Sequence, residues 1–167
     1  MRLAALLIAL LLAAPAAFGQ GARIPTEAVD RFHAALRAKN TAGALSMLDR
    51  GLVVFEFGVV DPTVEAYGLR HMPWDMDLAG ITTWKLETRR VGGEGNERWV
   101  LSTYRVTGKQ TNGKLIDQTT LETVILRRSG ELFRIVHFHW STNDAAFQAE
   151  QQGQRTSEQA PPESEKK

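Results

Sequence analysis

The sequence predicts an α+β fold in which helices pack on one face of an antiparallel sheet. Two observations carry this prediction. Helical patterns gather in the first half of the chain, up to Ala79-Gly80, and four successive strand patterns separated by glycine-bearing turns fill the second half. Helices followed by a meander are typical of an α+β domain.

The first half opens with a helix at Pro25, for which Thr26 is the expected N-cap. A second short helix is expected over 41–48, and the Val and Phe content of 52–58 predicts a strand. A third helical region follows and contains Tyr67 and His71. The four strands of the second half are expected over 84–91, 99–109, 115–127 and 132–141.

The two ends of the chain differ from this domain. A short basic start, an apolar run from Leu3 to Ala13 and the small-x-small site Ala17-Phe18-Gly19 predict a cleaved export signal over 1–19, since the run is too short to span a membrane. The stretch 148–167 is rich in Gln, Glu, Ser, Pro and Lys, which predicts a disordered polar tail. We therefore expect one domain, 24–147, in a periplasmic or secreted protein without a stable membrane anchor.

Composition narrows the classes of partner. Lys and Arg number 20 against 19 Asp and Glu, and loss of the signal removes Arg2, which leaves the mature chain neutral. Nucleic acid is not an expected partner, because phosphate binding needs a basic excess. The chain has no cysteine, which excludes disulfides and thiolate chemistry.

The hairpin turns predict how the strands align. If Asn112-Gly113 and Ser129-Gly130 are two-residue loops, each loop fixes which residues lie opposite one another in the two strands that it connects. The expected opposite pairs are Thr103 with Glu122, Arg105 with Thr120, Glu122 with His137 and Thr120 with His139. One face then has an apolar end (Trp99, Leu101, Val124, Leu126, Phe133 and Ile135) and a polar end (Thr103, Arg105, Thr120, Glu122, His137 and His139), as in a one-ended pocket.

The opposite face of the expected sheet also carries large apolar residues, namely Val100, Tyr104, Val106, Leu121, Ile125, Val136, Phe138 and Trp140. A solvated sheet face normally carries polar residues, so we expect this face to form a contact between two copies of the chain. The alternative is that helices cover this face and that the Glu122 face meets water.

Four features of the chain belong together: the early helices, the helical region with Tyr67 and His71, the stretch Leu121-Glu122-Thr123-Val124-Ile125-Leu126-Arg127-Arg128, and the ending Phe133-Arg134-Ile135-Val136-His137-Phe138-His139-Trp140-Ser141. They give a resemblance to the nuclear transport factor 2 superfamily, and within it to the SnoaL-like group of small exported bacterial proteins. It implies a cone-shaped barrel whose curved sheet encloses a helix-plugged cavity, often dimeric through the outer sheet face. It implies no single reaction, because the superfamily includes isomerases, cyclases, dehydratases, transport adaptors and a kinase association domain.

The expected cavity has residues suited to acid/base chemistry. A carboxylate orients a neighbouring imidazole and raises its pKa, so Glu122 with His137 is a candidate acid/base pair. Tyr67 and His71, four residues apart on a helix, are candidate donors to an oxyanion. The expected ligand-contacting residues are His139, Arg105, Thr103, Thr120, Trp99, Phe133 and Glu56, and Arg105 beside His139 would favour an anionic ligand. The alternative is a satisfied buried network without catalysis.

Metal binding is a competing interpretation, with His71, His137, His139 and Glu122 as ligands. The pattern is weak, since His-x-His also occurs in ordinary packing, and we expect no metal and no cofactor. The sequence thus predicts an exported, dimeric domain that binds a small molecule. Proton transfer in the same cavity, with His137 as base and Glu122 orienting it, is the second function class. A dimeric assembly module is the third.

Overall fold

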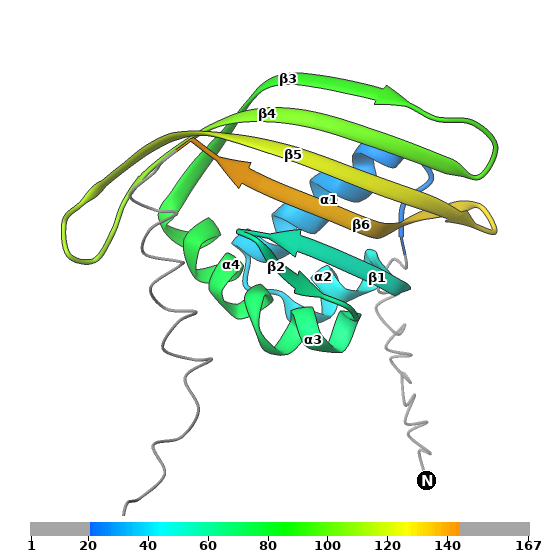
Figure 1. Ribbon diagram of the computed structural model, residues 1–167, viewed down its shortest axis with the longest axis horizontal. Coiled ribbons are helices and arrows are strands. Elements are labelled where there is room, and N and C mark those ends of the chain that lie inside the picture. Colours follow the sequence, from blue (N-terminus) through cyan, green and yellow to red (C-terminus); the bar gives the residue numbers. More distant parts are fainter. Residues whose placement is uncertain (1–20, 144–167) are drawn as a thin grey trace, which may run out of the picture.

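The computed structural model describes residues 21–143. The signal peptide expected over 1–19 and the tail expected over 148–167 lie outside this part of the chain. Within it, one curved sheet with the strand order β2-β1-β6-β5-β4-β3 arches over the helices (Figure 1). The helices are α1 (Pro25–Arg37), α2 (Thr41–Ser46), α3 (Val64–Leu69) and α4 (His71–Ile81). The strands are β1 (Leu48–Glu56), β2 (Val59–Asp61), β3 (Thr82–Gly92), β4 (Glu97–Lys109), β5 (Leu115–Ser129) and β6 (Leu132–Thr142).

The expected α+β class, with a curved sheet around the N-terminal helices, is confirmed. The sheet is mixed rather than purely antiparallel, because β1 runs parallel to β6. It also stays open, with β2 and β3 at its two edges. No helix in the described range is both long and apolar enough to cross a membrane.

Helix α1 lies against the inner, concave side of the sheet (Figure 1). Its N-cap is Ile24, which makes no side-chain cap bond, so the expected Thr26 cap is wrong by two residues. Pro25 occupies the first turn, where its fixed φ suits a helix and its missing N–H is no loss. The buried stripe is Ala28, Val29, Phe32, Ala35 and Leu36.

The turn between β4 and β5 is one residue longer than expected. Gln110 N donates to Lys114 O at 2.8 Å, and Gly113 N donates to Gln110 O at 2.9 Å. Gly113 has φ +90°, which fits a left-handed last position in a three-residue loop. The register therefore slips by one residue, so that Ser102, and not Thr103, lies opposite Glu122.

Strand β6 contains a β-bulge at Val136. Leu126 pairs with Ile135 on one side of the bulge and Ile125 pairs with His137 on the other. Phe133 and Ile135 therefore face inward, and beyond the extra residue the inward positions are Phe138, Trp140 and Thr142. Because a strand has a period of two, the bulge turns His137 and His139 to the outer face.

The core fills the space between the inner sheet face and the helices. Its largest fully buried side chains include Tyr67, Phe32, Phe133, Phe138, Leu52 and Leu126. Most of the face assigned to a dimer contact from the sequence is therefore helix-covered core, which includes Val100, Tyr104, Val106, Phe138 and Trp140. Leu121 is an exception, because the first hairpin slip leaves it on the outer face, 54% exposed.

Candidate functional site

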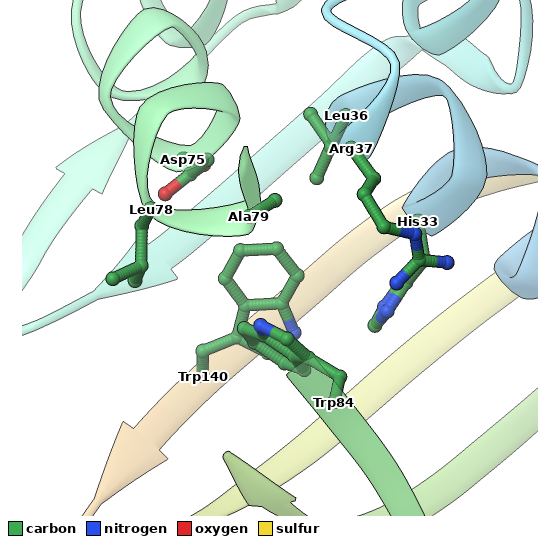
Figure 2. A pocket seen from close by; sticks show the side chains of 8 residues that line it. All are labelled: His33, Leu36, Arg37, Asp75, Leu78, Ala79, Trp84 and Trp140. Atoms are coloured by element: carbon green, nitrogen blue, oxygen red, sulfur yellow. The ribbon is translucent and has the colours of Figure 1, made fainter. Parts of the chain in front are cut away.

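A cavity opens between α1, α4 and the inner face of β3, β4 and β6. Its outer part, here called the mouth, has a volume of about 230 Å³ and is lined by Asp30, His33, Arg37, Trp84, Leu86, Arg89 and Tyr104. His33, Arg37 and Trp84 also line a deep end that adds Leu36, Asp75, Leu78, Ala79 and Trp140 (Figure 2). The deep end has a volume of about 10 Å³, which is room for about one water molecule.

His33 on α1 and Glu122 on β5 link the helix to the sheet beneath the cavity. The imidazole Nε2 lies 2.6 Å from Glu122 Oε1, and the two side chains are 11% and 1% exposed. Trp140 Nε1 donates to the same oxygen at 2.8 Å, and the Tyr104 hydroxyl donates to Oε2 at 3.3 Å. Burial alone would raise the pKa of the Glu122 carboxyl, but His33, the Trp140 donor and the Arg89 charge hold the pKa below its usual value.

Arg89 on β3 is held at the mouth by three partners. Its guanidinium donates to the Tyr104 hydroxyl at 2.7 Å, to Ser102 Oγ at 3.2 Å and to Asp30 Oδ1 at 2.8 Å. Burial, and after it the Glu122 charge, raise the pKa of Tyr104 to about 12, so this hydroxyl stays a donor near neutral pH. Arg89 is therefore a preorganised cation at the cavity entrance.

Aromatic rings form the walls. The ring centroid of Trp84 lies 5.4 Å from the centroids of His33 and Tyr104 and 5.5 Å from that of Trp140. The Trp84 and Trp140 indoles lie together between α1 and α4, with His33 and Arg37 projecting from α1 on one side (Figure 2). Such a box offers flat apolar surfaces to a ligand and polar groups at its entrance.

Behind the deep end, α3 and α4 bury a proton-sharing group. The Tyr67 hydroxyl donates to Asp75 Oδ2 at 2.8 Å, and Glu56 on β1 hydrogen bonds to Asp75. Two carboxyl groups can hydrogen bond only when one holds a proton. Burial is the main cause that raises the pKa of Asp75 to about 7, and burial followed by the Asp75 charge raises the pKa of Tyr67 well above its usual value.

His71 does not point into the cavity as a donor. Its Nδ1 pairs with the buried Asp61, which also forms an ion pair with Arg70 at 2.7 Å. Asp61 engages one of the two ring nitrogens, and His71 is not among the residues that line the mouth or the deep end, so its expected role as an oxyanion donor stays a prediction. Tyr67 is buried behind Asp75, and its hydroxyl acts through that carboxylate rather than facing the cavity directly.

The structure divides the predicted site residues between the two sheet faces. Glu122, Thr120, Glu56 and Phe133 face inward and are buried, although Phe133 lies at the far end, under Arg98 and Arg128. His137, His139, Arg105, Thr103 and Trp99 lie on the outer face, so their expected place beside Glu122 is wrong. The β4 residues lie on the other face than expected because the turn before β5 has three residues instead of two. The two histidines do so because of the bulge at Val136.

Each misplaced residue has its own surroundings on the outer face. His137 Nδ1 lies 2.8 Å from Val53 O, and Arg105 pairs with Asp117 at 2.6 Å. Trp99 lies across Gly92, where a Cβ would come within 2.1 Å of its ring. Partial burial, and after it His137, lower the pKa of the His139 ring. The expected acid/base pair of Glu122 with His137 is not formed.

The four residues of the competing metal-binding interpretation are not brought together either. His71 pairs with Asp61 on the helical side, Glu122 lies inside, and His137 and His139 lie outside. Within 21–143 there is no group of three or more His, Asp or Glu side chains arranged to hold a metal ion.

The sequence interpretation missed most of the mouth. Asp30, His33 and Arg37 follow one another at helical spacing beside the apolar stripe of α1, and this polar line was the available signal. Arg89 could not be placed from the sequence, because a second bulge, between Leu86 and Thr88, turns it inward.

Comparisons with known proteins agree on the fold. No protein-family model matches the chain, and no curated protein matches it either. Among solved structures, a protein from Shewanella frigidimarina provisionally called a ketosteroid isomerase is 28% identical, with a TM-score of 0.65 over 69% of this chain and 92% of its own. An NTF2-like protein of unknown function from Pseudomonas putida is 19% identical, with a TM-score of 0.58 over 70% of this chain and 82% of its own.

A third neighbour is the CaMKII hub of S. rosetta, 19% identical, with a TM-score of 0.59 over 70% of this chain and 92% of the hub. The fold and these neighbours define the class of fold: the chain has the curved α+β fold of the nuclear transport factor 2-like and cystatin-like proteins. Its place in the SnoaL-like group stays a prediction.

Proposed function

We propose that the protein binds a small molecule in the cavity between α1, α4 and the inner sheet face. The observation that carries this proposal is a mouth that presents Arg37, Arg89 and His33, adjoined by a deep end that reaches Trp140 and Asp75 and shares three lining residues with it. Charged and aromatic side chains line the mouth, and mostly apolar side chains line the deep end, so that polar groups meet an apolar surface as in ordinary ligand sites. The volume of about 230 Å³ is below the 300–1,000 Å³ range of drug-sized pockets, which favours a small ligand.

Proton transfer is the second candidate, and one observation favours it. Asp75 lines the deep end with a pKa of about 7, a value suited to a general acid or base at neutral pH. The Shewanella neighbour named as an isomerase is consistent with this candidate. In this version Asp75 replaces His137 as the proton-transfer group, and Tyr67 and Glu56 position it.

Native mass spectrometry of the purified mature protein tests binding. We expect a copurifying small molecule in the wild type and its loss in Leu86→Trp, which fills the mouth from an exposed position, 43% accessible. Val91→Trp is the matched control, because Val91 is 48% exposed on the same strand and does not line the cavity. Equal ligand retention in Leu86→Trp and the wild type would contradict this location.

We also propose that two copies associate through the outer sheet face. Exposed Leu101, Leu121 and Phe55 lie on that face. The CaMKII hub and association-domain neighbours support self-assembly. The residues differ from those expected from the sequence, since Tyr104, Phe138 and Trp140 are buried inside the protomer.

Export is the remaining part of the proposal. The apolar run from Leu3 and the site Ala17-Phe18-Gly19 support cleavage before Gln20. Mass spectrometry of the protein recovered from outside the cytoplasm should find Gln20 as the first residue. A full-length chain beginning at Met1 in that fraction would contradict cleavage.

A further inference from the structure

We propose that the ligand is a small monoanion with a planar body, whose carboxylate is bound between Arg37 and Arg89. This inference rests on the proposed binding function and adds the chemical class of the ligand. Both guanidinium groups line the mouth, one from α1 and the other from β3. Two arginines on opposite walls of one cavity suit the two oxygens of a carboxylate.

The charge balance of the mouth favours one negative charge. Arg37 and Arg89 contribute two positive charges, and Asp30 contributes one negative charge. His33 is hydrogen bonded to Glu122, which is buried beneath the mouth and is not among its lining residues. The entrance thus has one positive charge in excess, which a monoanion neutralises.

Arg37 is the open binding position of the two. No side chain within the described range hydrogen bonds or forms an ion pair with its guanidinium, which is exposed at the end of α1. Arg89 is different, because Tyr104 and Ser102 orient it from inside and Asp30 covers it from the solvent side. A ligand carboxylate can therefore bind the Arg37 guanidinium directly. On Arg89 it can either bind beside the Asp30 carboxylate or displace it.

Asp30 is a specificity residue in this arrangement. Its carboxylate lies 2.8 Å from Arg89, and its side chain is 61% exposed, so the pair is a weak, solvent-screened one. A ligand carboxylate competes with Asp30 for the same guanidinium, and a dianion would meet repulsion from Asp30. Neutralising Asp30 should therefore strengthen the binding of anions and leave neutral ligands unaffected.

The aromatic walls define the rest of the ligand. Trp84, Tyr104 and His33 border the mouth with ring planes inclined to one another, and Trp140 closes the deep end. Flat surfaces of this kind favour a planar body through stacking and edge contacts. An aromatic monocarboxylate combines both features at a size suited to about 230 Å³.

Isothermal titration of the mature protein with benzoate, benzamide and acetate tests this inference. Benzoate should bind at least 10-fold more tightly than benzamide, which lacks the charge, and than acetate, which lacks the ring. Arg37→Gln should weaken benzoate at least 10-fold and leave benzamide unchanged, whereas Asp30→Asn should strengthen benzoate about threefold. Arg105→Gln, an exposed arginine of the outer face, is the matched control and should change nothing.

The outcomes separate this inference from the proposed function. Equal affinity for benzoate and benzamide, or an unchanged benzoate affinity in Arg37→Gln, would overturn the anionic class while the cavity remains a binding site. Absence of benzoate binding would also overturn the class. Retention of the copurifying molecule in Leu86→Trp would instead contradict the binding location itself. Circular dichroism of each variant shows whether it is folded, and the exposed positions of Arg37 and Asp30 make folded variants the expected result.

Discussion

His33 on α1 and Glu122 on β5 form a buried pair, 2.6 Å apart, that joins the helical layer to the sheet directly below the cavity. Eighty-nine residues separate them in the sequence. Trp140 Nε1 donates to Glu122 Oε1, the same oxygen that His33 Nε2 contacts. One buried carboxylate therefore holds two side chains that line the cavity, one from the helical layer and one from the sheet.

Glu122→Gln should destabilise the fold, because it leaves the His33 ring without its carboxylate partner. Breaking a buried pair by removing one partner costs about 3–5 kcal/mol, which urea unfolding followed by fluorescence measures. Asp117→Asn is the control on the same strand, since its pair with Arg105 is exposed and should change the free energy of unfolding by less than about 1 kcal/mol. Equal effects of the two substitutions would contradict a buried pair of His33 and Glu122 that stabilises the fold.

Stability should fall as pH rises from about 5 to 8. Between the ordinary Asp pKa and about 7, the folded state holds a proton on the buried pair that contains Asp75, and the unfolded state has lost it. One such proton gives a slope of at most about 1.4 kcal/mol per pH unit, which disappears above the folded pKa.

Asp75→Asn should make this slope shallower in urea unfolding measured across the same pH range. Asp77→Asn, at an exposed position of the same helix paired with Lys39, should keep the wild-type slope. The buried proton would be refuted by a wild-type stability that rises steadily from pH 5 to 8.

The order of the elements was predictable from the sequence, because periodicity and turn residues are local signals. All four strands of the second half were predicted within three residues of their observed ends. The face of each side chain was not predictable, because it depends on counting residues through turns and bulges. One extra loop residue before Lys114 and the extra Val136 in β6 decided which polar side chains lie inside.

The candidate site shows the same division between what local sequence patterns predict and what depends on contacts between distant parts of the chain. Glu122, Thr120 and Glu56 lie on the inner face as expected, because alternation along a strand keeps them on the same side as buried apolar neighbours. The partners of Glu122 come from α1 and from beyond the bulge, and no local pattern relates His33 or Trp140 to it. His137 and His139 formed the most conspicuous pattern in the sequence and lie on the other side of the sheet.

The outer position of His139 gives a direct check on the bulge. Since partial burial and His137 lower its pKa, His137→Gln should raise the midpoint of the His139 ring signal in an NMR titration. Glu122→Gln should leave that midpoint unchanged, because the sheet separates the two residues. A shift in the His139 midpoint caused by Glu122→Gln would place both on one face.

Self-association through the outer face predicts that Leu121→Glu gives monomers. An unpaired charge in an apolar contact costs several kcal/mol, and Leu121 is 54% exposed in the single chain, so the fold should tolerate the change. Light scattering should report half the wild-type mass. Leu69→Glu, 86% exposed on α3, is the control and should keep the wild-type mass. A wild-type protein that is monomeric at millimolar concentration would contradict self-association through the outer face.

The indole N–H signals of the four tryptophans test the central claim most directly. Trp84 and Trp140 line the cavity, and their Nε1 groups donate to Thr82 and Glu122, whereas Trp99 lies on the outer face. A ¹H–¹⁵N spectrum is recorded while the copurifying molecule, or benzoate where none is retained, is added. Binding in the inner cavity should shift the Trp84 and Trp140 signals together and leave Trp99 in place. A shift of Trp99 with Trp84 and Trp140 unmoved would contradict it and place the site on the outer face.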